Sequence, residues 1–359
     1  MKKVDRYKQS IELDPDDVDA WTNLGDSYYE EADYVNALEC YKKIAKDLDP
    51  YSSEAWNNMG LVYSYIGEQN KAIKCYQKAI SLNPDDAIVY YNMGFSYEEL
   101  EEIDEAINCY SKALEFDPTY IDALNNIALI YRERELYQEA IENYNRALII
   151  DPDNIHVIKN LAYINHELME FDEAIRYYRV ALELKPRNAK IWERLGNLYY
   201  EINNYDDAIK CLQKAVQFDP YYIDAWNDLG LYHVFLDEYE KSIEFYEKAI
   251  ELDPNDYILY ENIAYSYYKM NKYDEAKQFY SKSIELNSEN PSALKNLGLI
   301  YFYEKQYDDA VECFLKASQF NPNDFEIWEL LGSLYEKKND HEKAKGYYEQ
   351  ASKWKKRNS

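Results

Sequence analysis

The chain repeats one pattern of apolar, small and polar residues every thirty-four residues. Large apolar side chains recur three and four residues apart, which is the spacing of one face of a helix. Counted from its start, each repeat is predicted to form a first helix over roughly positions two to fourteen and a second over roughly positions eighteen to thirty. The ten repeats begin at Val18, Ser53, Ala87, Ile121, Ile155, Ala189, Ile223, Tyr257, Pro291 and Phe325.

Four positions of the repeat have a nearly constant size. Position eight is always Gly or Ala, and position eleven is Tyr in all but two repeats. Position twenty is Ala or Ser, and position twenty-four is aromatic or Leu. Small residues let two helices approach closely, and large residues fill the gaps between them. Because one helix pair cannot cover its own apolar face, each pair is expected to pack on the next.

Prolines mark the junctions between repeats. Nine of the ten prolines lie there, where a residue without an N–H ends the preceding helix. The Asp and Asn residues that follow, as in Asp85-Asp86, Asp153-Asn154 and Asn255-Asp256, are suited to cap the next helix. The first repeat has one extra residue between Tyr41 and Pro50. We expect residues 1–17 to form an N-terminal half repeat that caps the array, residues 18–352 to form ten repeats in one solenoid domain, and residues 353–359 to be a basic tail.

The sixth repeat illustrates the motif most fully. It contains Trp192-x-x-Leu195-Gly196-x-x-Tyr199, followed by Ala208, Leu212 and Pro220. The chain therefore resembles the tetratricopeptide repeat (TPR) superfamily, whose signature is W-x-x-L-G-x-x-Y, then A-x-x-x-F, then P. This resemblance implies an all-α, right-handed superhelical solenoid of tetratricopeptide helix-turn-helix repeats. It also implies that positions two, five, six, nine, twelve and thirteen of each first helix line a concave groove.

Charge and hydropathy narrow the choice of partner and compartment. The formal net charge is −28, from 68 acidic and 40 basic residues, so we expect no nucleic-acid binding, which needs clustered Lys and Arg. No stretch approaches the roughly twenty apolar residues of a membrane span. The N-terminal residues also lack the apolar core of a secretory signal. The expectation is a cytoplasmic, acidic protein without membrane insertion.

No arrangement of residues predicts catalysis. The four histidines lie at unrelated positions of the repeat, without other ligands at metal-binding spacing, and no glycine-rich loop suits a phosphate. The five cysteines all occupy position twenty-three, too far apart for disulfides, and are expected to be reduced packing residues. The prediction is a non-enzymatic protein with no cofactor and no metal.

Position six carries a row of asparagines that is a candidate peptide site. Besides Asn23, its members are Asn58, Asn92, Asn126, Asn160, Asn262 and Asn296. A primary amide offers a donor and an acceptor together, so the row suits the backbone of an extended peptide. At about 10 Å per repeat and about 3.4 Å per extended residue, one Asn would meet every third peptide residue. The alternative is that each Asn bonds to a neighbouring helix.

A basic spot is predicted on the same face of repeats four to six. Its members are Arg132, His156, Lys159, Lys190 and Arg194. Such side chains are suited to hold an acidic group or a C-terminal carboxylate of a peptide. Lys190, Arg194 and Asn160 also resemble part of the carboxylate clamp of TPR co-chaperones. The alternative is neutralisation within the chain by Glu133, Glu167, Glu193 and Glu201.

Apolar candidates for the groove flank the basic spot. They are Tyr91, Phe95, Leu129 and Tyr163 on one side, and Leu231, Val234, Phe235, Tyr265, Tyr268, Phe302 and Tyr303 on the other. Val234-Phe235 is unusual because most repeats carry solvent-facing residues at positions twelve and thirteen. A contiguous apolar patch on the inner face would indicate a partner.

These observations favour a protein-interaction scaffold or adaptor whose concave groove binds a peptide segment of a partner protein. Two alternatives stay open. One is a structural scaffold that self-associates by stacking through its end repeats, with the basic tail against an acidic first repeat. The other is the repeat portion of a larger enzyme or of a secretion or assembly component.

Overall fold

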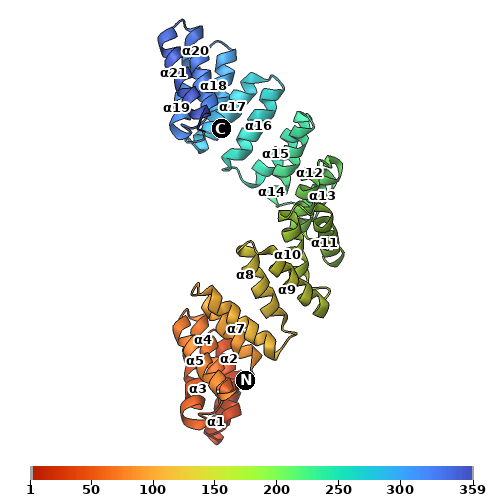
Figure 1. Cartoon of the computed structure of the whole chain (residues 1–359), viewed down its shortest axis with the longest axis vertical. Helices are drawn as coiled ribbons and strands as arrows, with labels where there is room; N and C mark the ends of the chain where they lie inside the picture. Colours follow the sequence, from red (N-terminus) through yellow and green to blue (C-terminus); the bar gives the residue numbers. More distant parts are fainter. Residues whose placement is uncertain (1–2, 358–359) are drawn as a thin grey trace. The chain divides into compact units, whose positions relative to one another are not determined.

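The computed structural model describes residues 3–357, which form helices joined by short turns, with no strand among them. The chain divides into two units, Met1–Val180 and Ala181–Ser359, and the division falls within helix α11, Phe171–Leu184. Within each unit, consecutive helices pack as pairs that stack on one another (Figure 1). The all-α architecture of helix-turn-helix repeats that the sequence predicts is therefore confirmed.

The first unit begins with the single helix of the half repeat, whose residues 1–2 lie outside the described part of the chain. Each later repeat contributes two helices. The bounds are α1 Lys3–Leu13, α2 Val18–Glu30, α3 Tyr34–Lys43, α4 Ser53–Tyr65, α5 Gln69–Leu82, α6 Ala87–Glu98, α7 Ile103–Phe116, α8 Ile121–Glu133, α9 Tyr137–Ile150 and α10 Ile155–Glu167, with α11 completing the fifth repeat.

The second unit contains the helix pairs of repeats six to ten. Their bounds are α12 Ala189–Glu201, α13 Tyr205–Phe218, α14 Ile223–Phe235, α15 Tyr239–Leu252, α16 Tyr257–Lys269, α17 Tyr273–Leu286, α18 Pro291–Tyr303, α19 Tyr307–Phe320, α20 Phe325–Lys337 and α21 His341–Lys355. In both units the helices begin at positions one and seventeen, about one residue earlier than the sequence pattern predicts.

Local polar contacts fix where the first helices begin. Asp86, Asn154 and Asp256 accept hydrogen bonds from backbone N–H groups of the following turn, as their place after the prolines predicts. Tryptophans at position four make a second hydrogen bond to the junction before the helix. The indole N–H groups of Trp21, Trp192, Trp226 and Trp328 donate to the proline carbonyl six residues earlier, at 2.9, 2.8, 2.9 and 2.9 Å.

The turn within each helix pair passes through one residue of left-handed backbone. This residue is always position fifteen. Gly67 has φ 81° there, and the other nine repeats adopt the same conformation without glycine. These residues are Ala32, Glu101, Glu135, Met169, Asn203, Asp237, Asn271, Lys305 and Asn339.

The core of each pair is built where positions eight and twenty-four meet. The Tyr110 side chain is fully buried against Gly94, and a Cβ at residue 94 would lie 2.8 Å from its ring. Position twenty-three lies beside it and holds the cysteines, all of which are free and buried as predicted. Burial raises the pKa of Cys40 and Cys109 to about 11, so these thiols stay protonated near neutral pH.

The first and the last repeat each depart from the regular pattern. The extra residue of the first repeat is absorbed by a π-helical turn, Ile44–Leu48, which follows α3 and closes with a 2.8 Å bond from Asp49 N–H to the Ile44 carbonyl. At the other end α21 continues to Lys355, so the beginning of the predicted basic tail is helical, and Lys355 pairs with Glu329 at 3.5 Å. Residues 358–359 of that tail lie outside the described chain.

Candidate functional site

Side chains at positions five and six join the first helices of neighbouring repeats. In the first unit, Asn92 Nδ2 donates to Asn57 Oδ1 at 3.0 Å, and Asn126 Nδ2 donates to the Tyr91 hydroxyl at 3.4 Å. In the second unit, Asn262 Nδ2 donates to Asn227 Oδ1 at 3.0 Å. The bond to a neighbouring helix, which the sequence left open as an alternative, is therefore present at these positions.

Six members of the predicted asparagine row are half-buried, whereas Asn23 is exposed. Asn58, Asn92, Asn126 and Asn160 lie in the first unit, and Asn262 and Asn296 lie in the second. Asn58 Oδ1 accepts a 3.4 Å bond from Asn57, and Asn160 Oδ1 accepts a 3.2 Å bond from Arg132. These contacts use one half of each amide, the donor in Asn92, Asn126 and Asn262 and the acceptor in Asn58 and Asn160.

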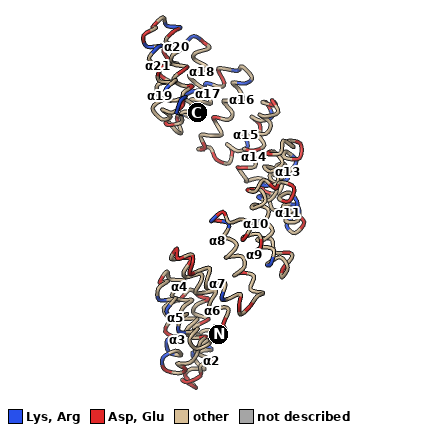
Figure 2. Tube along the Cα trace, viewed as in Figure 1, with Lys and Arg blue, Asp and Glu red and all other residues tan. Residues whose placement is uncertain are grey.

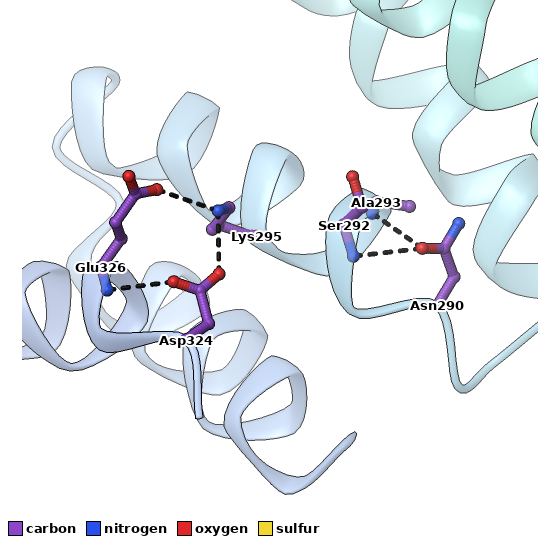
Figure 3. Close-up of polar contacts among 6 residues, drawn as sticks. All are labelled: Asn290, Ser292, Ala293, Lys295, Asp324 and Glu326. Carbon is purple, nitrogen blue, oxygen red and sulfur yellow. Dashed lines mark hydrogen bonds and ion pairs between the residues drawn. The ribbon is translucent and has the colours of Figure 1, made fainter. Parts of the chain in front are cut away.

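Position five also contacts the residue that caps the next first helix. Asn290, only 5% exposed, donates from Nδ2 to Glu261 Oε2 at 2.6 Å. Its Oδ1 meanwhile accepts from the backbone N–H groups of Ser292 and Ala293 (Figure 3). One repeat later, Lys295 Nζ lies 2.9 Å from Asp324 and 3.1 Å from Glu326 (Figure 3). Charged residues at position five thus help to hold adjacent repeats together.

Three members of the predicted basic spot lie in the first unit. Arg132 on α8 donates to Asn160, lies 4.0 Å from Glu133, and has its guanidinium 5.5 Å from the ring centre of Tyr163. On α10, His156 is exposed and Lys159 is half-buried. Arg132 is thus engaged with its own unit, which includes the neutralisation by Glu133 that the sequence offers as an alternative.

The other two members lie in the second unit. Lys190 and Arg194 are both exposed on α12, and Arg194 Nε lies 3.6 Å from Glu193 Oε2. Neutralisation by Glu193 is thus present as well. Because Arg132, His156 and Lys159 belong to one unit and Lys190 and Arg194 to the other, the basic spot as a single site stays a prediction.

Glu193 is part of a buried polar network in the second unit. It is 5% exposed and accepts bonds from Asn197 at 2.7 Å and from the Tyr222 hydroxyl at 3.2 Å. Tyr232 in turn donates to Asn197 Oδ1 at 2.6 Å. Burial raises the pKa of Glu193, so the network favours the protonated acid more than water does.

Asp228 lies in the same region, where most repeats carry the position-six asparagine. Its pKa is raised from the ordinary 3.8 to about 6, chiefly by burial; the carboxylates of Glu193 and Asp224 also raise it, while Asn197 and Arg194 lower it. In the sequence this residue is noticeable only because it is not Asn at position six. Its altered acidity depends on burial, which the repeat pattern does not report.

A hollow of about 400 Å³ opens among α14, α15 and α16. It is lined by Leu231, Val234, Phe235, Asp237, Tyr239, Tyr246, Asn262, Tyr265 and Lys269. Phe235 is 56% exposed and Tyr265 is 37% exposed. The sequence singles out Leu231, Val234, Phe235 and Tyr265 as groove candidates, and the structure brings these four together.

The sequence did not nominate Tyr239, Tyr246, Asp237 or Lys269 for this hollow. Tyr239 and Tyr246 belong to the second helix, and Asp237 lies in the turn, so none of them is on the face assigned to the groove. Lys269 could have been noticed in the sequence, because it places a basic residue at position thirteen, where five repeats carry Glu. The hollow thus combines an apolar wall with one anion and one cation.

Among residues 3–357, no group of three or more His, Cys, Asp or Glu side chains is arranged to hold a metal ion. The helices in the described part of the chain also include none that is both long and apolar enough to cross a bilayer. Basic and acidic residues are both scattered along the described trace of each unit (Figure 2).

Helix pairs that stack on one another through the same repeated contact define a helical-repeat protein. Family models identify the repeat family to which the chain belongs. A model described as TPR repeat matches residues 4–31, 62–101, 170–203, 196–234 and 264–303. Models described as tetratricopeptide repeat match residues 18–46, 87–120, 121–154, 223–256, 245–278, 291–324 and 325–358. The chain belongs to the tetratricopeptide repeat superfamily, and six of these matches begin at predicted repeat starts. Members of this family act in general as scaffolds that bind proteins or peptides.

Solved structures of helical-repeat proteins are similar to the chain. PilF of Pseudomonas aeruginosa is 26% identical, with 58% of this chain and 95% of that chain covered and a TM-score of 0.48. Yeast Tom70 is 17% identical, with 98% and 88% covered and a TM-score of 0.48. YrrB, described as a TPR protein with an unusual peptide-binding site, is 27% identical, with 52% and 96% covered and a TM-score of 0.45. A search of curated proteins found no match.

Proposed function

We propose that the chain is an adaptor that binds a segment of a partner protein along the face formed by its first helices. The observation that carries the proposal is the hollow of about 400 Å³ in the second unit, which gathers exposed aromatic side chains on that face. Contiguous exposed apolar surface on a folded protein is typical of interaction sites. The binding surface is already formed in the chain, so association requires little ordering.

The hollow suits a bulky side chain of the partner. Phe235 on α14 and Tyr265 on α16 both line it. Covering one such ring stabilises a complex by about 1.5–3 kcal/mol. Asn262 Oδ1 offers an acceptor to a peptide N–H, because the donor half of that amide is bonded to Asn227. A few polar groups around an apolar wall fix the orientation of a ligand.

The asparagine row offers further hydrogen bonds to the backbone of the bound segment. Asn92 and Asn126 donate to the preceding repeat, so their Oδ1 atoms are the groups that would accept from a peptide backbone. Asn160 has the opposite arrangement, with its acceptor bonded to Arg132. On α12, exposed Lys190 would receive an acidic group or C-terminal carboxylate of the partner.

The test compares the proteins that the full chain retains from a lysate with those retained by two variants. Phe235→Ala combined with Tyr265→Ala removes the aromatic wall of the hollow. Tyr221→Ala removes an aromatic side chain that is 79% exposed in the junction before α14 and serves as the matched control. The proposal expects a partner that is retained by the parent and the control and lost from the double variant.

A second arm tests the polar part of the groove. Asn126→Ala and Asn160→Ala in the first unit, and Lys190→Ala and Arg194→Ala in the second, are compared as two separate pairs. Weaker retention of the same partner by either pair supports its part of the groove. An unchanged set of retained proteins in every variant rules out the first-helix face as the binding surface.

A further inference from the structure

Helix α6 of the first unit exposes a stripe of apolar side chains, which we call the α6 stripe. Its members, Ile88, Tyr91 and Phe95, are three and four residues apart and therefore lie on one side of the helix. Ile88 is 57% exposed and Phe95 is 42% exposed. Tyr91 between them is half-buried, and its ring centre lies 4.8 Å from that of Tyr120. The middle of the stripe is thus fixed by packing, while both its ends face water.

The helix pair does not need an apolar residue at the first position of this stripe. Ile88 occupies position two, which is charged, His or Ser in eight of the ten repeats. The third repeat is also the only one with apolar residues at positions two, five and nine together. An exposed isoleucine adds little to stability, because burial is what makes an apolar side chain stabilising. Exposed apolar side chains that gather on one surface are typical of a contact with another molecule.

Carboxylates surround the α6 stripe. The pKa of Tyr91 is raised chiefly by burial and also by the carboxylates of Asp122 on α8 and Glu98 on α6, while the Asn126 amide lowers it. Glu98 accepts a 2.6 Å hydrogen bond from the Tyr110 hydroxyl and is half-buried. Asp122 occupies position two of the following repeat and is exposed, as is Glu54 at the same position of the preceding repeat. Negative charge therefore lies on both sides of the stripe.

No basic side chain of these first helices offsets that charge. Helices α2, α4 and α6 contain no Lys or Arg. Their acidic residues are Asp19, Asp26, Glu30, Glu54 and Glu98. The one cation of α8, Arg132, donates to Asn160 of α10 and lies over the Tyr163 ring of that helix. Among residues 3–357, Glu54, Glu98 and Asp122 have no Lys or Arg within ion-pair distance.

Acidic residues on other first helices are paired within the chain. Glu193 lies 3.6 Å from Arg194, and Glu326 lies 3.1 Å from Lys295. The carboxylates beside the α6 stripe differ in lacking such a partner. A cationic ligand can therefore approach them without displacing a side chain of the chain itself.

We propose that the α6 stripe and its carboxylates bind a basic segment of another protein. An apolar side chain of the segment covers Ile88 and Phe95, and neighbouring Lys or Arg residues meet Glu54, Glu98 and Asp122. Lys and Arg suit this surface because their methylene stems lie along apolar groups while the charged end reaches a carboxylate. This inference rests on the proposed function and names the charge of the segment and the residues of the first unit that receive it.

Fluorescence anisotropy with the full chain and labelled peptides tests the proposal. The probe contains two Lys-Leu-Lys triplets joined by glycines. One control peptide replaces each Leu with Ser at the same charge, and another replaces each Lys with Glu at the same apolar content. The probe is expected to bind roughly tenfold more tightly than either control peptide. Added salt is expected to weaken the probe, because exposed charges are screened.

Two pairs of substitutions remove the two parts of the surface. Ile88→Ala with Phe95→Ala removes the exposed ends of the stripe, and Glu54→Gln with Asp122→Asn removes two carboxylates at nearly constant size. Each pair is expected to weaken binding of the probe roughly tenfold. Thermal unfolding of both variants checks that they are folded.

Matched controls lie on second helices of the same unit. Val35→Ala with Ile149→Ala removes apolar side chains that are 71% and 82% exposed. Glu105→Gln with Glu142→Gln changes the net charge by the same amount at two exposed positions. Both control pairs are expected to leave binding of the probe unchanged.

Three outcomes would overturn the proposal. Equal weakening by the Glu54 and Asp122 pair and by its control would show that the probe responds to the overall charge of the chain. Equal binding of the Leu and Ser peptides would show that the α6 stripe takes no part. Light scattering in which the full chain self-associates, and Glu54→Gln with Asp122→Asn separates the copies, would assign the surface to a second copy of the chain.

Selection of random peptides on the full chain separates failure of this inference from failure of the proposed function. Enriched peptides that require Phe235 and not Phe95 contradict the inference and leave the hollow of the second unit as the binding surface. Enriched peptides that depend on neither residue contradict both.

Discussion

The Nδ2 group of Asn92 donates a 3.0 Å hydrogen bond to Oδ1 of Asn57, its neighbour on the first helix of the preceding repeat. The same bond joins Asn262 to Asn227 in the second unit. A residue type that suits a peptide backbone therefore also connects consecutive repeats.

The hydrogen bond between Asn92 and Asn57 is expected to contribute measurably to the free energy of unfolding. Asn92→Ala is expected to lower the free energy of unfolding by about 1 kcal/mol, the usual net worth of a partly buried hydrogen bond. A double-mutant cycle with Asn57→Ala, followed by urea denaturation, isolates the pair. Additive effects of the two substitutions would show that the amides are not coupled.

Position eight controls how closely the two helices of a pair approach. Gly94→Ala is expected to destabilise the chain by about 1–2 kcal/mol, because the added Cβ would lie 2.8 Å from the buried Tyr110 ring. Gly346→Ala is the control, since nothing lies within 4 Å of a Cβ there. That change is expected to raise stability by about 0.5–1 kcal/mol through helix propensity alone. The same sign for both changes in thermal unfolding would contradict this account of the packing.

The left-handed residue of each turn offers a way to stabilise the chain. Glu101 has φ 60°, a conformation that costs an L residue about 1–2 kcal/mol and glycine much less. Glu101→Gly is therefore expected to raise the free energy of unfolding by about 0.5 kcal/mol after the entropy cost of glycine. Gly67→Ala is expected to act in the opposite direction, and a destabilising Glu101→Gly would contradict the prediction.

Asp228 predicts a dependence of stability on pH. Its folded-state pKa is raised to about 6, so the folded chain binds this proton more tightly than the unfolded chain does. The resulting stabilisation is complete below about pH 4 and is lost as the pH rises through about 6. Asp228→Asn, which restores the common residue of position six, should thus be about 3 kcal/mol more stable than the parent at pH 8 and nearly equal to it at pH 4. Urea denaturation at both pH values checks this, and a constant difference would contradict it.

The repeat pattern predicts most of the fold because size is conserved where helices touch. Gly94 and Tyr110 occupy positions whose alternation of small and large side chains recurs in nearly every repeat. The extra residue between Tyr41 and Pro50 appears as the π-helical turn Ile44–Leu48. The left-handed position fifteen is not visible in the sequence, because closure of the turn imposes that backbone on residues as different as Ala32 and Lys305.

The candidate site is less predictable, because it depends on which neighbour each polar group meets. Arg132 bonds to Asn160, and Arg194 lies beside Glu193, contacts that a period of thirty-four residues does not specify. The hollow needs Tyr239 from a second helix, whereas the groove positions inferred from the family all lie on first helices. Of the predicted residues, the asparagine row and the basic spot stay proposals for binding.

Photo-cross-linking from position 235 tests the central claim most directly. A benzophenone side chain replaces Phe235 in one variant and Tyr221, an exposed ring outside the hollow, in another. The account predicts a defined cross-linked partner segment from position 235 and not from position 221, with the adduct weakened by Tyr265→Ala. Equal adducts from the two positions, or an adduct at 235 that is indifferent to Tyr265, would contradict it.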